Sequence, residues 1–150
     1  MASTVIESWK LITAIDNYED VAGKILFTRI FTIAPEAYPL FSFSKDNELM
    51  SEGMYECPKF KKHAAGVIRT VNTAVGMLGP DLSALADVLK ALGKKHVKYG
   101  VLEAHYAVVG QALIETLAAA MGDKFTADVK AAWLSIWGII SSTMIAGADY

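Results

Sequence analysis

Large apolar residues recur along this chain at steps of three and four, the spacing of one buried helical face. The clearest case lies in residues 82–106, where four leucines share one stripe: Leu82, Leu85, Leu89 and Leu92. The next position on that stripe is His96 rather than another leucine. Gly100 follows where a helix end is expected. The pattern therefore predicts a helix that carries a histidine on its apolar face.

The same spacing predicts five further helices, at residues 4–14, 18–33, 58–78, 103–121 and 126–146. Thr4 and Glu7 form a capping-box pattern, and Thr126 is a candidate N-cap. Residues 42–57 are polar and aperiodic, which predicts a loop or a loose helical turn, and the Pro35–Pro39 segment predicts a short helix. No stretch alternates long enough to predict a strand. We expect one all-α domain, residues 1–150, with six or seven helices.

Each of these helices has a predicted inward face. In the first three of them, the residues predicted to point inward are Val5, Ile6, Trp9 and Ile12, then Val21, Ile25, Leu26, Ile30 and Phe31, then Phe60, His63, Val67, Val71, Ala74 and Leu78.

Composition narrows the classes of function. Hydrophobic residues make up 53% of the chain and charged residues 20%. This excess of hydrophobic residues indicates either that the chain covers a bound apolar group or that it forms a homodimer rather than a monomer. A net charge of −2 favours neither nucleic acid nor an anionic membrane as a partner. Cys57 is the only cysteine, so no internal disulfide is expected and a cytoplasmic location is the default. We also expect neither a secretory signal nor a membrane span.

His63 and His96 occupy comparable positions on the apolar faces of two helices. A single such histidine is more often a hydrogen-bonded core residue, but two of them suggest a metal site. Two imidazoles are too few for structural zinc, whereas a haem needs only one or two axial ligands and an apolar slot. The candidate slot residues are Phe27, Phe41, Phe43, Phe60, Val67, Leu92 and Val101.

Three segments carry a resemblance to the globin family: VAGKILFTRIFTIAPEAYPLFSF, PKFKKHAAGVI and LGKKHVKYGVLEAHYAVVGQALIETL. They stand in the family's order and spacing, and Pro35, Phe41, His63 and His96 together make the match specific. The chain looks most similar to plant non-symbiotic haemoglobins (phytoglobins), with neuroglobin-like and bacterial single-domain globin features. The resemblance implies a globin fold of six to eight helices in a three-on-three arrangement around haem b (iron protoporphyrin IX).

The resemblance also implies roles for individual residues. His96 would be the proximal iron ligand and Phe41 would stack on the porphyrin, with Phe27 in the distal pocket. His63 would either donate a hydrogen bond to a bound gas or bind the iron itself as sixth ligand, the bis-histidine state. Tyr106 lies ten residues after His96, a spacing shared with flavohaemoglobins, and is a candidate haem-binding residue, although core packing is the simpler interpretation.

A globin of this kind is expected to bind oxygen, nitric oxide or carbon monoxide reversibly. Nitric oxide dioxygenase activity would depend on a separate reductase, because the chain has no Gly-x-Gly-x-x-Gly nucleotide motif. The alternative is a non-enzymatic redox or gas sensor that signals when the distal histidine is displaced. A haem-free helical module is disfavoured, because both histidines are present.

Overall fold

A computed structural model describes residues 2–78, 83–98 and 101–148. Helices alone make up the secondary structure of these residues, and no strand occurs among them. The elements are α1 (Ala2–Thr13), α2 (Tyr18–Ile33), η1 (Pro35–Leu40), η2 (Ser42–Lys45), α3 (Glu52–Glu56), α4 (Pro58–Gly76), α5 (Ser83–Lys98), α6 (Glu103–Met121), η3 (Gly122–Lys124) and α7 (Ala127–Ala148), where η denotes a 3-10 helix.

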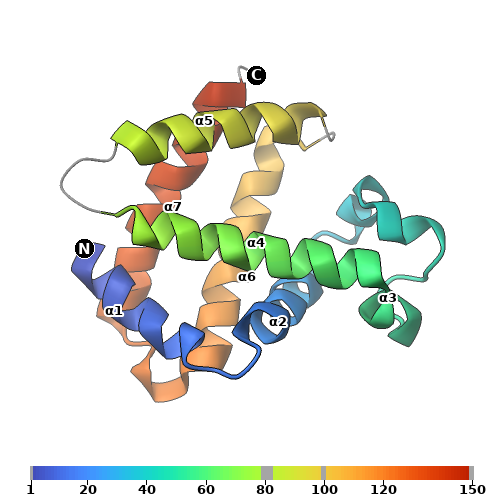
Figure 1. The fold of residues 1–150 in the computed structure, drawn as a ribbon, viewed down its shortest axis with the longest axis horizontal. Helices are drawn as coiled ribbons and strands as arrows, with labels where there is room; N and C mark the ends of the chain where they lie inside the picture. The colour runs from blue at the N-terminus through green and yellow to red at the C-terminus, as the bar shows by residue number, and fades with distance from the viewer. Residues whose placement is uncertain (1, 79–82, 99–100, 149–150) are drawn as a thin grey trace.

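Long helices cross each other in two layers (Figure 1). α4 runs across the front of the molecule, α6 crosses behind it, and α5 lies above α4 and crosses the upper end of α7. The most extensive helix pairs are α5 with α7, α2 with α4, and α2 with α6. The predicted all-α architecture is therefore confirmed for the described residues.

The first and last helices are joined by two buried tryptophans. The rings of Trp9 on α1 and Trp133 on α7 lie 5.8 Å apart, and Trp133 Nε1 donates to Ser8 Oγ over 2.8 Å. Ser8 Oγ in turn donates to the Val5 carbonyl oxygen at 3.0 Å. Trp9 Nε1 donates to Asn72 Oδ1 over 2.8 Å, which ties α1 to α4 as well. These polar pairs satisfy the indole groups within the apolar core.

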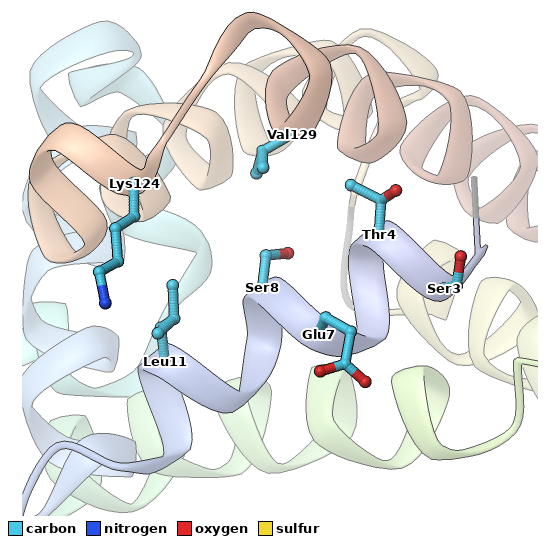
Figure 2. A pocket seen from close by; sticks show the side chains of 7 residues that line it. All are labelled: Ser3, Thr4, Glu7, Ser8, Leu11, Lys124 and Val129. Atoms are coloured by element: carbon cyan, nitrogen blue, oxygen red, sulfur yellow. The ribbon is translucent and has the colours of Figure 1, made fainter.

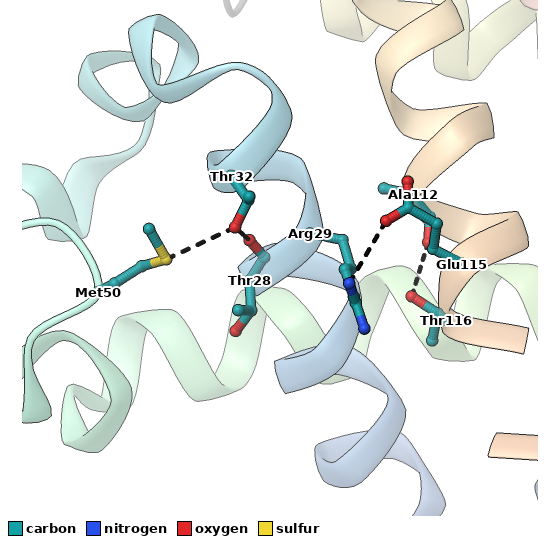
Figure 3. Close-up of polar contacts among 7 residues, drawn as sticks. All are labelled: Thr28, Arg29, Thr32, Met50, Ala112, Glu115 and Thr116. Carbon is teal, nitrogen blue, oxygen red and sulfur yellow. Dashed lines mark hydrogen bonds and ion pairs between the residues drawn. The ribbon is translucent and has the colours of Figure 1, made fainter. Parts of the chain in front are cut away.

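The segment between α2 and α4 is compact rather than an open loop. Tyr38 of η1 donates its hydroxyl to the Asn47 carbonyl oxygen over 2.7 Å, and Ser51 caps α3 by accepting from Met54 N at 3.1 Å. Thr32 on α2 reaches the sulfur of Met50 at 4.0 Å (Figure 3). The same view shows Arg29 Nη1 and Glu115 Oε1, 3.5 Å apart, linking α2 to α6. The predicted loose turn thus folds into η2 and α3 against α2.

α5 and α7 approach each other through two glycines. A β-carbon placed on Gly93 would overlap the carbonyl oxygen of Met144, and one placed on Gly147 would overlap the backbone of Lys90. Any side chain at either position would therefore force the two helices apart. The position of α5, which carries His96, is set by backbone contact with α7.

Several sequence predictions are confirmed and others need correction. α2 and α6 have the predicted limits, and Thr126 Oγ1 accepts from Val129 N at 3.3 Å as an N-cap does. The Thr4–Glu7 capping box is wrong, because α1 begins at Ala2 and Glu7 pairs with Lys10 instead. The helix ends predicted at Gly79-Pro80 and Gly100 lie outside the described residues.

Two residues predicted to point inward are exposed, Val21 and His63. Val21 is 40% exposed because Ala22 and Leu26 provide the buried positions on that part of α2. By length and composition alone, α7 is apolar enough to cross a membrane. That is weak support for a span, because core helices pass the same test and α7 packs on α5, α1 and α6.

Candidate functional site

His63 lies in the first half of α4 and points to a group of phenylalanine rings. Its imidazole is 5.2 Å from the Phe41 ring and 5.4 Å from the Phe27 ring, both edge-on, and 6.4 Å from the Phe43 ring. These rings come from three elements, namely α2, η2 and the junction between η1 and η2. Two segments separated in the sequence, α2 and residues 41–43, therefore converge on one histidine of α4.

The phenylalanines also pack on one another and form an aromatic wall, defined here as Phe27, Phe31, Phe41, Phe43 and Phe60. Neighbouring rings in this wall lie 5.2 to 6.4 Å apart, mostly edge to face. Phe41 is partly exposed, whereas the other four are buried. Interlocked rings have few alternative rotamers, so the wall is a rigid apolar surface beside His63.

The environment of His63 favours its neutral form. Burial lowers the pKa of His63 below the usual value of 6.5, and the nearby His96 lowers that pKa further. The His63 side chain keeps an exposed surface, although the Phe27 and Phe41 rings lie beside its imidazole. A neutral, accessible imidazole is the form that binds a transition metal.

His96, in the last turn of α5, has a fixed orientation. Its Nδ1 lies 2.7 Å from the Leu92 carbonyl oxygen. A carbonyl oxygen can only accept, so Nδ1 carries the proton and the lone pair of the neutral ring sits on Nε2. A hydrogen bond of this type orients a metal-binding histidine and raises its basicity. The ring of buried Tyr106 lies 6.5 Å from that of His96.

The helices that carry the two histidines pack mainly on other elements. α4 packs chiefly on α2, and α5 chiefly on α7, while α4 and α5 make little direct contact with each other. His96 nevertheless lies near enough to His63 to lower the pKa of that imidazole. Two imidazoles on helices that make little contact with each other, beside an apolar wall, fit a flat apolar group with two axial positions, which is what haem requires.

A cluster that could hold a bare metal ion is not present in the part of the chain that the structure describes. No group of three or more His, Cys, Asp and Glu side chains occurs there. The two histidines therefore suit a metal only if a cofactor supplies the remaining ligands, as porphyrin does.

The other predicted slot residues occupy two kinds of position. Val67, Leu92 and Val101 are half-buried, as residues that border a bound group would be. Phe60 lies in a second layer, where its ring contacts Phe27, Phe43 and Tyr55. Tyr106 packs in a small core with residues of α5 and α7, as the core-packing interpretation expected.

Sequence reasoning missed the part that Phe31 plays in this site. Phe31 was predicted only as a core residue of α2, yet its ring contacts Phe27, Phe41 and Phe43. Its spacing of four from Phe27 was the available signal, since such pairs share a helical face.

Two surface pockets have linings that contain no histidine. One, of about 400 Å³, lies between α1 and the start of α7 and is lined by Ser3, Thr4, Glu7, Ser8, Leu11, Lys124 and Val129 (Figure 2). Another, of about 670 Å³, is lined by residues of α6 and α7, including Tyr106 and Trp137. Because no histidine lines either pocket, we assign the candidate functional site to the histidine pair and not to these pockets.

A family model and similar known sequences indicate the same family. The Globin family model matches residues 24–144. The neuroglobin of Tetraodon nigroviridis is 34% identical over 125 residues, which cover 83% of this chain and 77% of that protein. The neuroglobin of Danio rerio is 35% identical with the same coverage.

Solved structures show the same fold at low sequence identity. A hexacoordinated haem protein from an anhydrobiotic tardigrade superposes with a TM-score of 0.86 at 19% identity, covering 99% of this chain and 93% of that one. A hexa-coordinate haemoglobin of Drosophila melanogaster has a TM-score of 0.84 at 19% identity, with 95% and 90% covered. Because the Globin family model matches residues 24–144, which are most of this chain, the chain belongs to the globin family.

Proposed function

We propose that this globin holds haem b between α4 and α5, with His96 as the proximal iron ligand and His63 as the sixth ligand at rest. One observation carries the proposal: His63, beside the aromatic wall, and His96, fixed by the Leu92 carbonyl oxygen, lie near each other on helices that make little contact with each other. Haem, when bound, supplies an iron that takes up diatomic gases and exchanges single electrons. Oxygen, nitric oxide and carbon monoxide are the ligands that we propose.

The bis-histidine resting state is favoured by the chemistry of His63. Its lowered pKa keeps the imidazole neutral at neutral pH, and its accessible ring is able to coordinate a metal. The tardigrade and Drosophila proteins of similar fold are described as hexacoordinate, which supports the same state here. A gas then binds only to molecules in which His63 has moved away, so its apparent affinity falls with the fraction of open molecules.

The remaining residues of the site would orient His96 and shield the distal side from water. The Leu92 carbonyl oxygen holds the Nδ1 proton of His96 and so directs Nε2 away from that carbonyl. The aromatic wall excludes water from the distal side, and Phe41, its partly exposed member, is the ring available for stacking on the porphyrin.

A nitric oxide dioxygenase activity, as in the phytoglobin-like interpretation, is a further part of the proposal. Each turnover that joins nitric oxide and dioxygen into nitrate consumes one electron. That electron has to come from a separate reductase, because the sequence has no nucleotide-binding glycine motif. A cytoplasmic location is consistent with the single free thiol, Cys57.

Visible absorption spectra of the oxidised and the anaerobically reduced protein test the coordination. Sharp, split visible bands in the reduced form are expected if His63 binds the iron, and one broad band would show an open sixth position. Absence of a Soret band after addition of haemin would refute the proposal.

The proximal ligand is tested by His96→Gly. This variant should lose haem, and added imidazole should restore the spectrum because it replaces the missing ligand. His105→Ala is the matched control: His105 Nδ1 accepts from Leu102 N at 3.0 Å and serves only the start of α6. Retention of a native spectrum by His96→Gly without imidazole would show that His96 is not the ligand.

A further inference from the structure

Charge is unevenly distributed along this chain. Residues 58–98, which hold α4 and α5, contain eight lysines or arginines and two aspartates, a net charge of +6. The remainder contains six basic and fourteen acidic residues, a net charge of −8. The two helices that carry the histidine pair are therefore basic on an otherwise acidic protein, although the net charge of −2 conceals this.

Six lysines account for most of that positive charge and lie near the two histidines. They are Lys59, Lys61 and Lys62 in the first half of α4, and Lys94, Lys95 and Lys98 in the last half of α5, here called the basic edge. All six side chains are exposed. The first half of α4 and the last half of α5 lie toward the same side of the molecule (Figure 1). Lys59, Lys61 and Lys62 lie within four residues of His63, and Lys94, Lys95 and Lys98 lie within two residues of His96, so both groups of lysines flank the histidine pair.

The lysines of the basic edge are mostly not neutralised by the protein itself. Lys61 pairs with Glu56 at 3.1 Å, and the other five form no ion pair with a carboxylate among the described residues. By contrast, Arg69, farther along α4, pairs with Glu19 of α2. Even if both carboxylates of haem b lay at this edge, residues 58–98 would retain a net charge of +4.

We propose that the basic edge is the docking surface for an acidic electron-transfer protein that reduces the iron. This inference rests on the proposed function, in which one electron leaves the partner and converts ferric iron to ferrous iron. Lys59 lies one helical turn before His63, and Lys94 and Lys95 immediately precede His96, so a partner seated there lies beside the histidine pair. Opposite charge accelerates such encounters and makes their rate depend on salt.

The distribution of the acidic residues favours a protein over a membrane or a nucleic acid. The net charge of −8 outside α4 and α5 repels an extended polyanion wherever it reaches beyond the edge. A protein with a compact acidic patch can contact the lysines of the basic edge, five of which form no ion pair with a carboxylate among the described residues. The basic edge therefore favours a partner whose surface is negatively charged and whose charged area is small.

The test uses reduced flavodoxin, an acidic flavin protein, as the probe of ferric holoprotein in anaerobic stopped-flow experiments. The wild-type rate constant should fall steeply as ionic strength rises from about 10 mM to about 300 mM. Lys59→Glu/Lys94→Glu should lower the low-salt rate constant about tenfold or more. Lys124→Glu/Lys130→Glu is the control, because these exposed lysines lie in η3 and α7 and the change in net charge is the same.

The outcomes separate this proposal from the proposed function. All variants should keep the wild-type visible spectrum, whereas a missing Soret band would refute the haem site itself. In that case, calorimetric titration with oxidised flavodoxin still tests the edge, since binding requires no haem. Equal rate constants or affinities for the two double variants would overturn the docking proposal. Edge-dependent binding to phosphatidylserine vesicles without an effect on flavodoxin would overturn it in favour of a lipid surface.

Discussion

Gly93 of α5 lies directly against the carbonyl oxygen of Met144 on α7, with no room for a β-carbon between them. His96 follows three residues later on the same helix and bonds through Nδ1 to the Leu92 carbonyl oxygen. The contact between two backbones therefore determines where the candidate proximal ligand lies. This relation leads to a direct test.

We predict that Gly93→Ala displaces α5 and destabilises the protein by about 1–3 kcal/mol, because backbone atoms of α7 cannot move aside cheaply. Haem should also transfer faster to an excess of another apoglobin, since His96 moves with α5. Urea unfolding and the haem-transfer rate provide the two measurements.

The control for this change is Gly138→Ala on α7, where a β-carbon would meet no atom within 4 Å. There the better helix propensity of alanine should stabilise the protein by up to about 1 kcal/mol. Similar effects of the two substitutions would contradict the close-contact interpretation.

Replacing the distal histidine should open the sixth position. We predict that His63→Leu yields five-coordinate ferrous protein and raises the apparent affinity for carbon monoxide about 10- to 100-fold, if about 1–10% of wild-type molecules are open. Carbon monoxide titration followed in the visible spectrum measures this affinity. An unchanged affinity would mean that His63 does not compete for the iron.

The pKa of His63 predicts a pH dependence of the apoprotein. The pKa of His63 in the folded chain lies below the value of 6.5 expected in the unfolded chain. At a pH between these two pKa values, the unfolded chain therefore binds more protons than the folded chain. Stability should therefore be fully present above about pH 6.5 and decrease as the pH falls through the folded pKa. Urea unfolding of wild type and His63→Gln at several pH values tests this, and parallel curves would disprove it.

The buried indole of Trp133 depends on Ser8 for its hydrogen bond. Ser8→Ala should cost about 1–3 kcal/mol of unfolding free energy, because it leaves Trp133 Nε1 buried without that acceptor. Ser142→Ala is the matched control on the exposed side of α7, and its effect should stay within about 0.5 kcal/mol. Urea unfolding followed by tryptophan fluorescence distinguishes the two, and equal effects would argue against a role for this bond.

Local signals in the sequence were sufficient for most helix limits. Asn17, which has a left-handed φ of 56°, separates α1 from α2 at the predicted break, and Gly122 ends α6 with a φ of 57°. Such residues act on the backbone beside them, so their effect is visible in the sequence alone. The positions of His63 and His96 on their helices were predictable for the same reason, because helical periodicity is a local property.

Contacts between distant segments were decided only by the tertiary structure. The predicted capping box at Thr4 does not form, because α1 already begins at Ala2 and Thr4 therefore lies inside the helix. The aromatic wall draws Phe31 and Phe43 together with His63 from separate elements, and Gly93 matters only because Met144 lies against it. No local pattern specifies the atoms opposite a side chain, since these come from residues tens of positions away. The sequence alone thus determined the helices and the histidine positions, whereas packing decided how closely α5 approaches α7 and which rings surround His63.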